Sequence, residues 1–171
     1  MDEVSFIMML RFFWLDTSAI VKIFCDEPGS WEIRKVFNNK PNNIFYTSEF
    51  CVYEYYNVLK RKFLKDKVIS EDNYLKLVFT LSMNIRLKTI KYIENDENPD
   101  VLFLQTKEVI QKYGFDYADA IQFILIRKGL LGSLAGESQP VLITSDNEMI
   151  AAANAENIKY WNPEKGPFIP E

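Results

Sequence analysis

FFWLDTSAIVKIF, residues 12–24, decides the fold because it joins two apolar runs through one carboxylate and two hydroxyl groups. Residues 12–15 form a short hydrophobic run of the kind that is buried in a sheet. From Ala19 the apolar pattern resumes at once, with a spacing suited to a short helix. Between the runs stand Asp16, Thr17 and Ser18. A charged group in such surroundings destabilises a fold unless it has partners, so the position of Asp16 needs an explanation.

The chain as a whole has the composition of one globular domain. It has 171 residues, of which 48% are hydrophobic and 26% charged, and it contains no repeat or low-complexity segment. We expect a single domain over residues 1–171, with 1–7 as an N-terminal extension. Arg11 and Asp16 interrupt the apolar opening well short of the ~20 residues of a membrane span, and the opening lacks the basic start of a signal peptide. We therefore expect a cytoplasmic protein without a membrane segment.

Charge and the rarer residue types exclude several chemistries. The net charge of -4 argues against nucleic-acid binding through an overall positive field, so any basic patch must be local. The chain has no histidine, which excludes hydrolysis with a histidine base, histidine-ligated zinc and histidine acid–base nucleases. Cys25 and Cys51 form neither a zinc nor a disulfide pattern, and we expect both to be small buried hydrophobic residues. Carboxylate, lysine and hydroxyl chemistry remain.

Apolar spacing and capping residues predict alternating strands and helices. Thr47 or Ser48, and Ser70, are suited to cap helices, Gly114 is suited to end one, and residues 28–29 form a turn. We expect strands at 8–15, 44–46, 87–93, 141–144 and 158–161, and helices at 17–24, 31–37, 49–65, 71–84, 99–113, 116–131 and 147–154, with a loop at 132–140. This order predicts an α/β fold with three layers, α/β/α, around a mostly parallel central sheet.

Two acids follow predicted strands. Asp16 comes directly after the first strand, and Asp146 follows the strand at 141–144 with only Ser145 between them. Ligands of open parallel sheets bind outside the carboxyl ends of the strands, near the point where the strand order reverses. We therefore expect both carboxylates at the same edge of the sheet.

Further acids lie on predicted helices. Glu54 is surrounded in the sequence by apolar residues, so we expect little solvent-facing surface around it and a need for a partner. Asp116, Asp119 and Gln122 recur every third residue and form one polar stripe on an otherwise apolar helix. That stripe faces either solvent or a site.

Each acid taken singly also has a purely structural explanation. Asp16 and Asp146 precede helices and could be N-caps. Asp116 and Asp119 have the spacing of a capping pair, and Glu54 could be neutralised by a nearby lysine. All of these explanations must hold together to remove the case for a site.

Five motifs, in order, resemble the PIN domain family, in particular the VapC-like ribonuclease toxins of bacterial toxin–antitoxin pairs. They are LDTSAIVKIF, TSEFCVYEYYNVLK, GFDYADAIQF, LITSDNEMIAAA and IKYWNP, and they span nearly the whole chain. The resemblance implies a PIN-like fold and places Thr17 or Ser18 at the hydroxyl position beside the first acid, with Asp116 as a cap or outer group. It assigns catalytic and metal-binding roles to Asp16, Glu54, Asp119 and Asp146.

The resemblance also implies an activity, a cofactor and partners. Carboxylate oxygens without histidine or cysteine favour hard cations, so Mg²⁺ or Mn²⁺ is expected. The implied activity is that of a metal-dependent endoribonuclease, which hydrolyses RNA phosphodiester bonds. The implied partners are an RNA substrate, a cognate antitoxin that covers the site, and a second copy of the chain in a homodimer.

Two questions stay open at the level of sequence. The basic cluster after Glu54 could bind the RNA backbone, or it could be a solvated helix end that complements the helix dipole; it consists of Lys60, Arg61, Lys62 and Lys65. The domain could also be a PIN-like module that binds nucleic acid or protein without cleavage. A phosphatase with an aspartyl nucleophile is disfavoured, because it needs a second acid two residues after the first, where the chain has Ser18.

Overall fold

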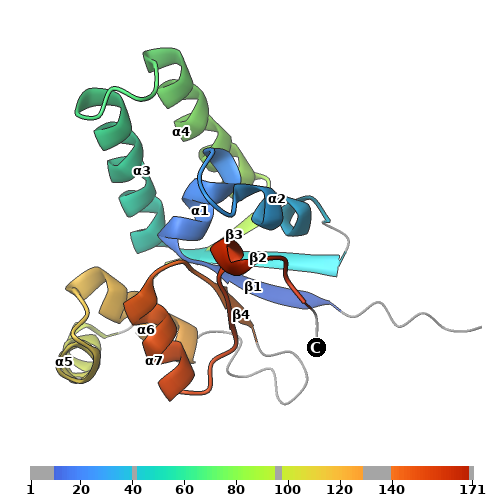
Figure 1. The fold of residues 1–171 in the computed structure, drawn as a ribbon. Coiled ribbons are helices and arrows are strands. Elements are labelled where there is room, and N and C mark those ends of the chain that lie inside the picture. The colour runs from blue at the N-terminus through green and yellow to red at the C-terminus, as the bar shows by residue number, and fades with distance from the viewer. Residues whose placement is uncertain (1–9, 40–41, 95–97, 129–139, 170–171) are drawn as a thin grey trace, which may run out of the picture.

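The structure is a computed structural model that describes residues 10–39, 42–94, 98–128 and 140–169 (Figure 1). Within these ranges the strands form one parallel sheet in the order β3-β2-β1-β4-β5. The strands are β1 Arg11–Leu15, β2 Asn43–Ser48, β3 Ile90–Ile93, β4 Val141–Ile143 and β5 Tyr160–Trp161. The helices are α1 Thr17–Phe24, α2 Ser30–Asn38, α3 Glu49–Leu64, α4 Glu71–Arg86, α5 Pro99–Tyr113, α6 Tyr117–Lys128, α7 Asn147–Ala155 and the 3-10 helix η2 Pro163–Lys165.

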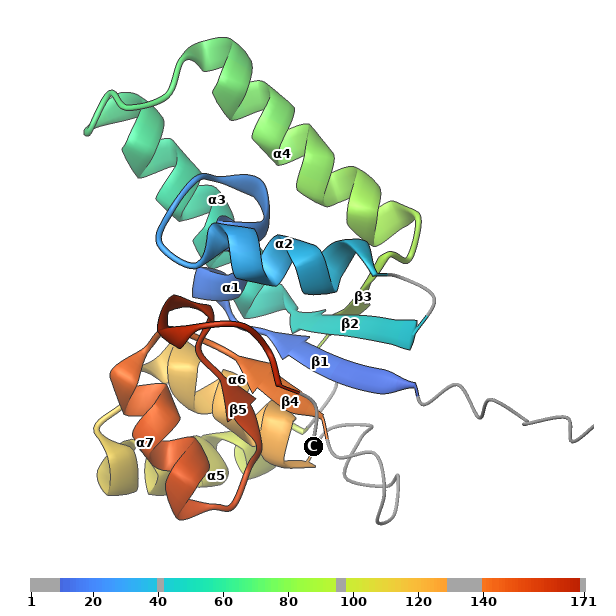
Figure 2. The ribbon, with the colours of Figure 1, turned by 45° about the vertical axis from the view of Figure 1, so that its right-hand side comes forward.

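Side chains of the central strand β1 alternate between two cores. Phe13 and Leu15 pack into a core with helices α1 to α4, whereas Trp14 packs into a second core with α5 to α7. Figures 1 and 2 show these two groups of helices on opposite faces of the sheet. None of the three side chains is more than 2% exposed, as expected for a parallel sheet that is covered on both faces. The prediction of three α/β/α layers around a parallel sheet is confirmed.

The strand order reverses beside β1. The chain adds β2 and then β3 on one side of β1, and it later adds β4 and β5 on the other side. The strands β1 and β4 therefore end next to each other, where Leu15 pairs with Ile143. The Asp16 N–H donates to the Ile143 carbonyl at 3.2 Å. Since ligands bind at such a reversal in open sheets, a site is expected at the ends of these two strands.

Local signals located most elements correctly. Helix α1 has the predicted bounds, Thr17–Phe24. The hydroxyls of Ser48 and Ser70 accept a backbone N–H from the first turns of α3 and α4, as predicted for N-caps. Gly114 ends α5 with a φ of 77°, the left-handed conformation that glycine accepts.

Strand lengths differ from the prediction. Strand β2 continues to Ser48, β3 begins only at Ile90, and β5 is restricted to Tyr160–Trp161. Strand β3 starts late because α4 continues to Arg86, after which Lys88 turns with a φ of 56°. The predicted extension 1–7, the strand start at 8–9, the helix end at 129–131 and most of the loop lie outside the described residues. Within the described ranges, no helix is both long and apolar enough to cross a membrane.

Gly29 allows the turn before α2 to lie against the C-terminal segment. Its φ is 83°, in the left-handed region that costs a residue with a Cβ about 1–2 kcal/mol. A Cβ at this position would lie 2.7 Å from the carbonyl carbon of Pro163 and 2.8 Å from the nitrogen of Glu164. The close approach holds η2 near α1, where Glu164 forms an ion pair of 2.8 Å with Lys22.

Replacing Gly29 with alanine is expected to lower the free energy of unfolding substantially. Gly114→Ala is the matched control, because Gly114 also has a positive φ but a Cβ there would meet nothing within 4 Å. We expect Gly29→Ala to lose about 1–3 kcal/mol more than Gly114→Ala, the usual result of overpacking. Urea unfolding of both variants measures the difference. Equal losses would show that the contact with Pro163 contributes nothing.

Candidate active site

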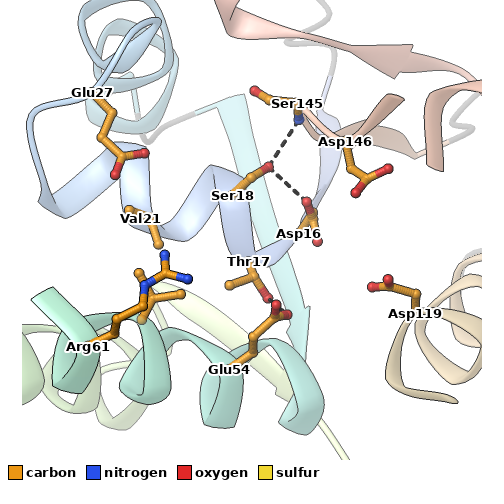
Figure 3. A pocket seen from close by; sticks show the side chains of 11 residues that line it. Asp16, Thr17, Ser18, Val21, Glu27, Glu54, Arg61, Asp119, Ser145 and Asp146 are labelled. Carbon is orange, nitrogen blue, oxygen red and sulfur yellow. Dashed lines mark hydrogen bonds between the residues drawn. The ribbon is translucent and has the colours of Figure 1, made fainter. Parts of the chain in front are cut away.

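A pocket of about 350 Å³ opens where β1 and β4 end. Side chains reach it from α1, α3, α6 and the junction between β4 and α7 (Figure 3). The residues that line it include the acids Asp16, Glu54, Asp119 and Asp146. Four segments that are far apart in the sequence therefore bring their carboxylates to one place, at the predicted edge of the sheet.

Asp16 is the most enclosed of these acids, with only 5% of its surface exposed. Its Oδ1 accepts a hydrogen bond of 3.0 Å from Gln122 Nε2, and its Oδ2 accepts bonds of 2.8 Å from the hydroxyls of Ser18 and Thr144. Asp16 occupies the N-cap position of α1, but its side chain makes no capping hydrogen bond. The capping explanation is therefore wrong for this side chain, which is held by side-chain donors from three segments.

Glu54 points into the pocket (Figure 3) but is not enclosed. The residue is exposed, contrary to our expectation, because its apolar neighbours such as Val52 and Tyr55 lie on another, buried side of α3. Its partner is the Thr17 hydroxyl, which donates to Oε2 at 2.6 Å, and not a lysine. Partial withdrawal from water raises the pKa of Glu54, and the nearby charge of Asp16 adds to the rise.

The carboxyl group of Asp119 is harder to ionise than an ordinary aspartate. Its pKa is raised to about 7, first because the carboxyl is partly withdrawn from water and then because of the charges of Asp116, Asp16 and other acids. Asp116 itself is exposed, and its Oδ1 accepts the Asp119 N–H at 2.9 Å. Asp116 thus acts as a cap of α6, as expected, whereas Asp119 faces the pocket.

Asp146 combines a structural and a pocket position. Its Oδ1 accepts the backbone N–H groups of Glu148 and Met149 at 2.7 and 2.9 Å, so the N-cap explanation is confirmed for this residue. The Asp146 N–H in turn donates to the Thr144 hydroxyl at 3.0 Å. The same hydroxyl donates to the Asp16 carboxylate, so Thr144 bridges the backbone of Asp146 and the side chain of Asp16.

The residues of the predicted basic cluster differ in whether they line the pocket. Arg61 lines the pocket together with Glu27, a further acid of the lining, on the side away from Asp119 (Figure 3). Lys62 does not line it and instead donates to Glu27 Oε1 at 2.7 Å. Lys60 and Lys65 are exposed and, in the structure as described, lie outside the pocket lining.

The sequence analysis missed two buried polar residues that contact acids of the pocket, Thr144 and Lys22. Thr144 was assigned only to a strand, although a threonine directly before the acid-bearing turn was a usable signal. Lys22, a single cation in the apolar run AIVKIF, is 4% exposed and pairs with Glu164 and Glu27. Cys25 was expected to be buried but is only half-buried, because it lies just beyond the end of α1.

The PIN domain family model matches residues 13–155. The chain belongs to the PIN domain family. Its fold is similar to that of FitAcB from Neisseria gonorrhoeae, with a TM-score of 0.56 and 14% identity, covering 89% of this chain and 98% of that one. It is also similar to FitAB bound to an IR36 DNA fragment, with a TM-score of 0.60 and 14% identity, covering 94% and 99%. No curated protein sequence matches the chain.

The donor set of this PIN domain fits a hard divalent cation. The four acids offer only oxygen atoms, and none of the ion pairs seen within the described ranges involves them. In the same ranges, no three acid or cysteine side chains already form a close chelating group. Mg²⁺ usually retains several waters and binds through one or two carboxylates. Acids that the fold holds somewhat apart therefore remain suitable ligands.

The raised pKa of Asp119 predicts a specific pH dependence of stability. Between the ordinary value of 3.8 and the folded value of about 7 the folded state binds more protons than the unfolded state, so stability falls as the pH rises through this window. Asp119→Asn, which is neutral throughout, should therefore have a higher melting temperature than wild type at about pH 8, and the difference should vanish near pH 4.

Melting curves in EDTA across this range measure the effect. Asp100→Asn is the matched control, because Asp100 is an exposed acid in the first turn of α5 and away from the pocket. It should be neutral or slightly destabilising at pH 8, since an acid near a helix N-terminus is favourable. A wild type that stays as stable as Asp119→Asn at pH 8 contradicts the raised pKa.

Proposed function

We propose that this PIN domain is an Mg²⁺- or Mn²⁺-dependent endoribonuclease that hydrolyses RNA phosphodiester bonds. The observation that carries the proposal is the meeting of four carboxylates in one pocket, without a lysine or arginine paired to them among the described ion pairs. Like charges in such a cluster destabilise the fold, and a bound cation converts that repulsion into attraction. The choice of RNA follows from the resemblance to VapC-like ribonucleases.

The residues of the pocket have distinct tasks in this proposal. A divalent cation held there supplies stabilisation of charge on a phosphoryl oxygen and makes an attacking water more acidic. Asp16 is the fixed ligand, because three donors hold it. Asp119 and Asp146 complete the ligand set, and Glu54, held by Thr17, orients a water. Ser18 supports the carboxylate of Asp16 from α1.

Arg61 is the basic residue best placed to contact a phosphate of the substrate. It follows Glu54 by about two helical turns on α3 and so lies on the same face. It lines the same pocket as the acids. Contacts of arginine with phosphates position a nucleic acid without reading its sequence. We include Lys60 and Lys65 as outer contacts, whereas Lys62 is already engaged by Glu27.

We further propose that the chain is a single-domain, cytoplasmic toxin that forms a homodimer and is held inactive by a cognate antitoxin. Its support is the resemblance of the five motifs to VapC-like toxins. The FitAB structure with its DNA fragment supports the fold at 14% identity. A short gene next to this one that encodes a DNA-binding protein would distinguish a toxin from a housekeeping nuclease.

Asp119 is a better position than Asp16 for testing the proposal. Both oxygens of Asp16 accept hydrogen bonds, so Asp16→Asn would direct an amide N–H at one of three donors and destabilise the fold. Asp119→Asn keeps the shape of the side chain and relieves repulsion among the acids.

Mg²⁺ or Mn²⁺ is expected to raise the melting temperature of the wild type. A ligand that binds only the folded state at about 100 times its Kd adds roughly 2.7 kcal/mol of stability. Asp119→Asn should lose most of this shift, whereas Asp100→Asn should retain it. Scanning calorimetry with and without millimolar cation measures both. An unchanged wild-type midpoint would argue against a preformed metal site.

Cleavage of single-stranded RNA is expected to fall by orders of magnitude in Asp119→Asn, because the variant removes a charge from the ligand set. RNA binding should persist and weaken with salt, since phosphate contacts release counter-ions. Gel assays with a broad RNA panel and Asp100→Asn as control measure both properties. If wild type and Asp119→Asn are equally inert and expression of the wild type does not slow growth, the domain is a binding module without cleavage.

A further inference from the structure

A buried chain of hydrogen bonds ends on Asp16. The Ser48 hydroxyl donates to Cys51 Sγ at 3.2 Å, the Cys51 thiol donates to Gln122 Oε1 at 3.0 Å, and Gln122 Nε2 donates to Asp16 Oδ1 at 3.0 Å. Ser48 and Cys51 are 0% exposed, Gln122 is 1% and Asp16 is 5% exposed. Ser48, Cys51 and Gln122 each donate to the next residue, so all three hydrogen bonds point toward the Asp16 carboxylate and polarise one another.

The two groups that contact the Gln122 amide, the Asp16 carboxylate and the Cys51 thiol, fix its orientation. An ionised carboxylate can only accept hydrogen bonds, so the amide must turn its N–H₂ toward Asp16 and its oxygen toward Cys51. The Cys51 thiol satisfies that oxygen. Burial raises the pKa of the thiol to about 12, so its proton is retained. A reversed amide would place two oxygens against each other inside the fold.

This chain of hydrogen bonds joins the two helices that carry Glu54 and Asp119. Cys51 lies one turn before Glu54 on α3, and Gln122 lies one turn after Asp119 on α6. Neither Cys51 nor Gln122 lines the pocket of the described structure. The bonds between them therefore fix α3 and α6 relative to Asp16 from behind the site.

We propose that Gln122 is a positioning residue that sets the geometry of Asp16 for cation binding and catalysis, and that the Cys51 thiol keeps the Gln122 amide in the required orientation. This inference rests on the proposed function. It assigns to Gln122 and Cys51 a role that the hydrophobic pattern does not give them. Partners behind a metal ligand typically change metal affinity or activity about 10–100-fold when they are removed.

The test uses two readouts on the full chain. Electron paramagnetic resonance of free Mn²⁺ measures cation affinity without any substrate, and a gel assay measures RNA cleavage. Gln122→Met keeps an unbranched side chain of similar length but removes the N–H donor. We expect it to lower Mn²⁺ affinity and the cleavage rate by about 10–100-fold.

Cys51 provides a rescue experiment. Cys51→Ala removes the donor to the Gln122 oxygen and should shift both readouts in the same direction as Gln122→Met, by a smaller factor. Cys51→Ser retains a hydroxyl donor and should recover most of that loss. Adding Cys51→Ala to Gln122→Met should produce no further loss, because residues in one chain of contacts do not act additively.

A stability control separates positioning from general weakening of the fold. Ile33 is 0% exposed in the core of α1 to α4 and does not line the pocket. Ile33→Val should lower the melting temperature and leave Mn²⁺ affinity unchanged. All measurements are made well below the midpoint of every variant, so that each remains folded.

The outcomes distinguish this inference from the proposed function. If wild type cleaves RNA and Gln122→Met matches it in both readouts, the inference is overturned and the ribonuclease stands. If wild type cleaves no RNA but binds Mn²⁺, and Gln122→Met binds it more weakly, the positioning role stands and the ribonuclease proposal fails. Absence of Mn²⁺ binding by the wild type overturns both. Equal behaviour of Cys51→Ala and Cys51→Ser overturns the role of the thiol.

Discussion

The buried carboxylate of Asp16 is the constraint on which the other features of this structure depend. An enclosed charge without partners destabilises a fold by several kcal/mol, and Asp16 is satisfied by donors from three segments. Two of those donors lie close in sequence to another pocket acid: Thr144 precedes Asp146, and Gln122 follows Asp119. Any movement that separates these two segments from β1 would leave the Asp16 carboxylate with the Ser18 hydroxyl as its one remaining side-chain donor among the described bonds. The bonds that stabilise Asp16 therefore also hold the segments that carry Asp119 and Asp146 close to it.

The positions of three pocket acids at helix N-termini reduce the electrostatic cost of bringing the carboxylates together. Asp16 and Asp146 occupy N-cap positions of α1 and α7, and Asp119 lies in the first turn of α6. A helix N-terminus stabilises a nearby negative charge by about 0.3–1 kcal/mol. Two like charges about 4 Å apart near a protein surface repel by roughly 4 kcal/mol, so the helix ends offset only part of such repulsion. The remaining repulsion contributes to the raised pKa of Asp119, after the larger effect of the partial withdrawal of its carboxyl from water.

Local patterns were sufficient for most of the fold and for placing Asp16 and Asp146 at one edge of the sheet, whereas Glu54 and Asp119 were assigned to the site through the resemblance to PIN domains. The strand before Asp16, the Ser48 and Ser70 caps and the rule for parallel sheets required only short stretches of sequence. The partners of the acids were not predictable in this way. The Thr17 bond to Glu54 and the Gln122 bond to Asp16 span 37 and 106 residues, and they depend on which side of a helix faces the sheet. The same dependence explains why Glu54 is exposed although its sequence neighbours are apolar.

The structural and the functional explanations of these acids are not alternatives. A carboxylate has two oxygens with about four lone pairs, and Asp146 uses Oδ1 for the cap of α7 while the residue lines the pocket. Glu54 likewise accepts from Thr17 through Oε2. The carboxylates of Asp16, Glu54 and Asp146 are thus positioned by hydrogen bonds that need no cation. Small metal domains, in contrast, have no packed structure until the metal binds. The walls of this pocket rest on two packed cores and on hydrogen bonds of the chain itself. The pocket therefore forms by folding alone, and the cation that we propose for it is not needed to build it.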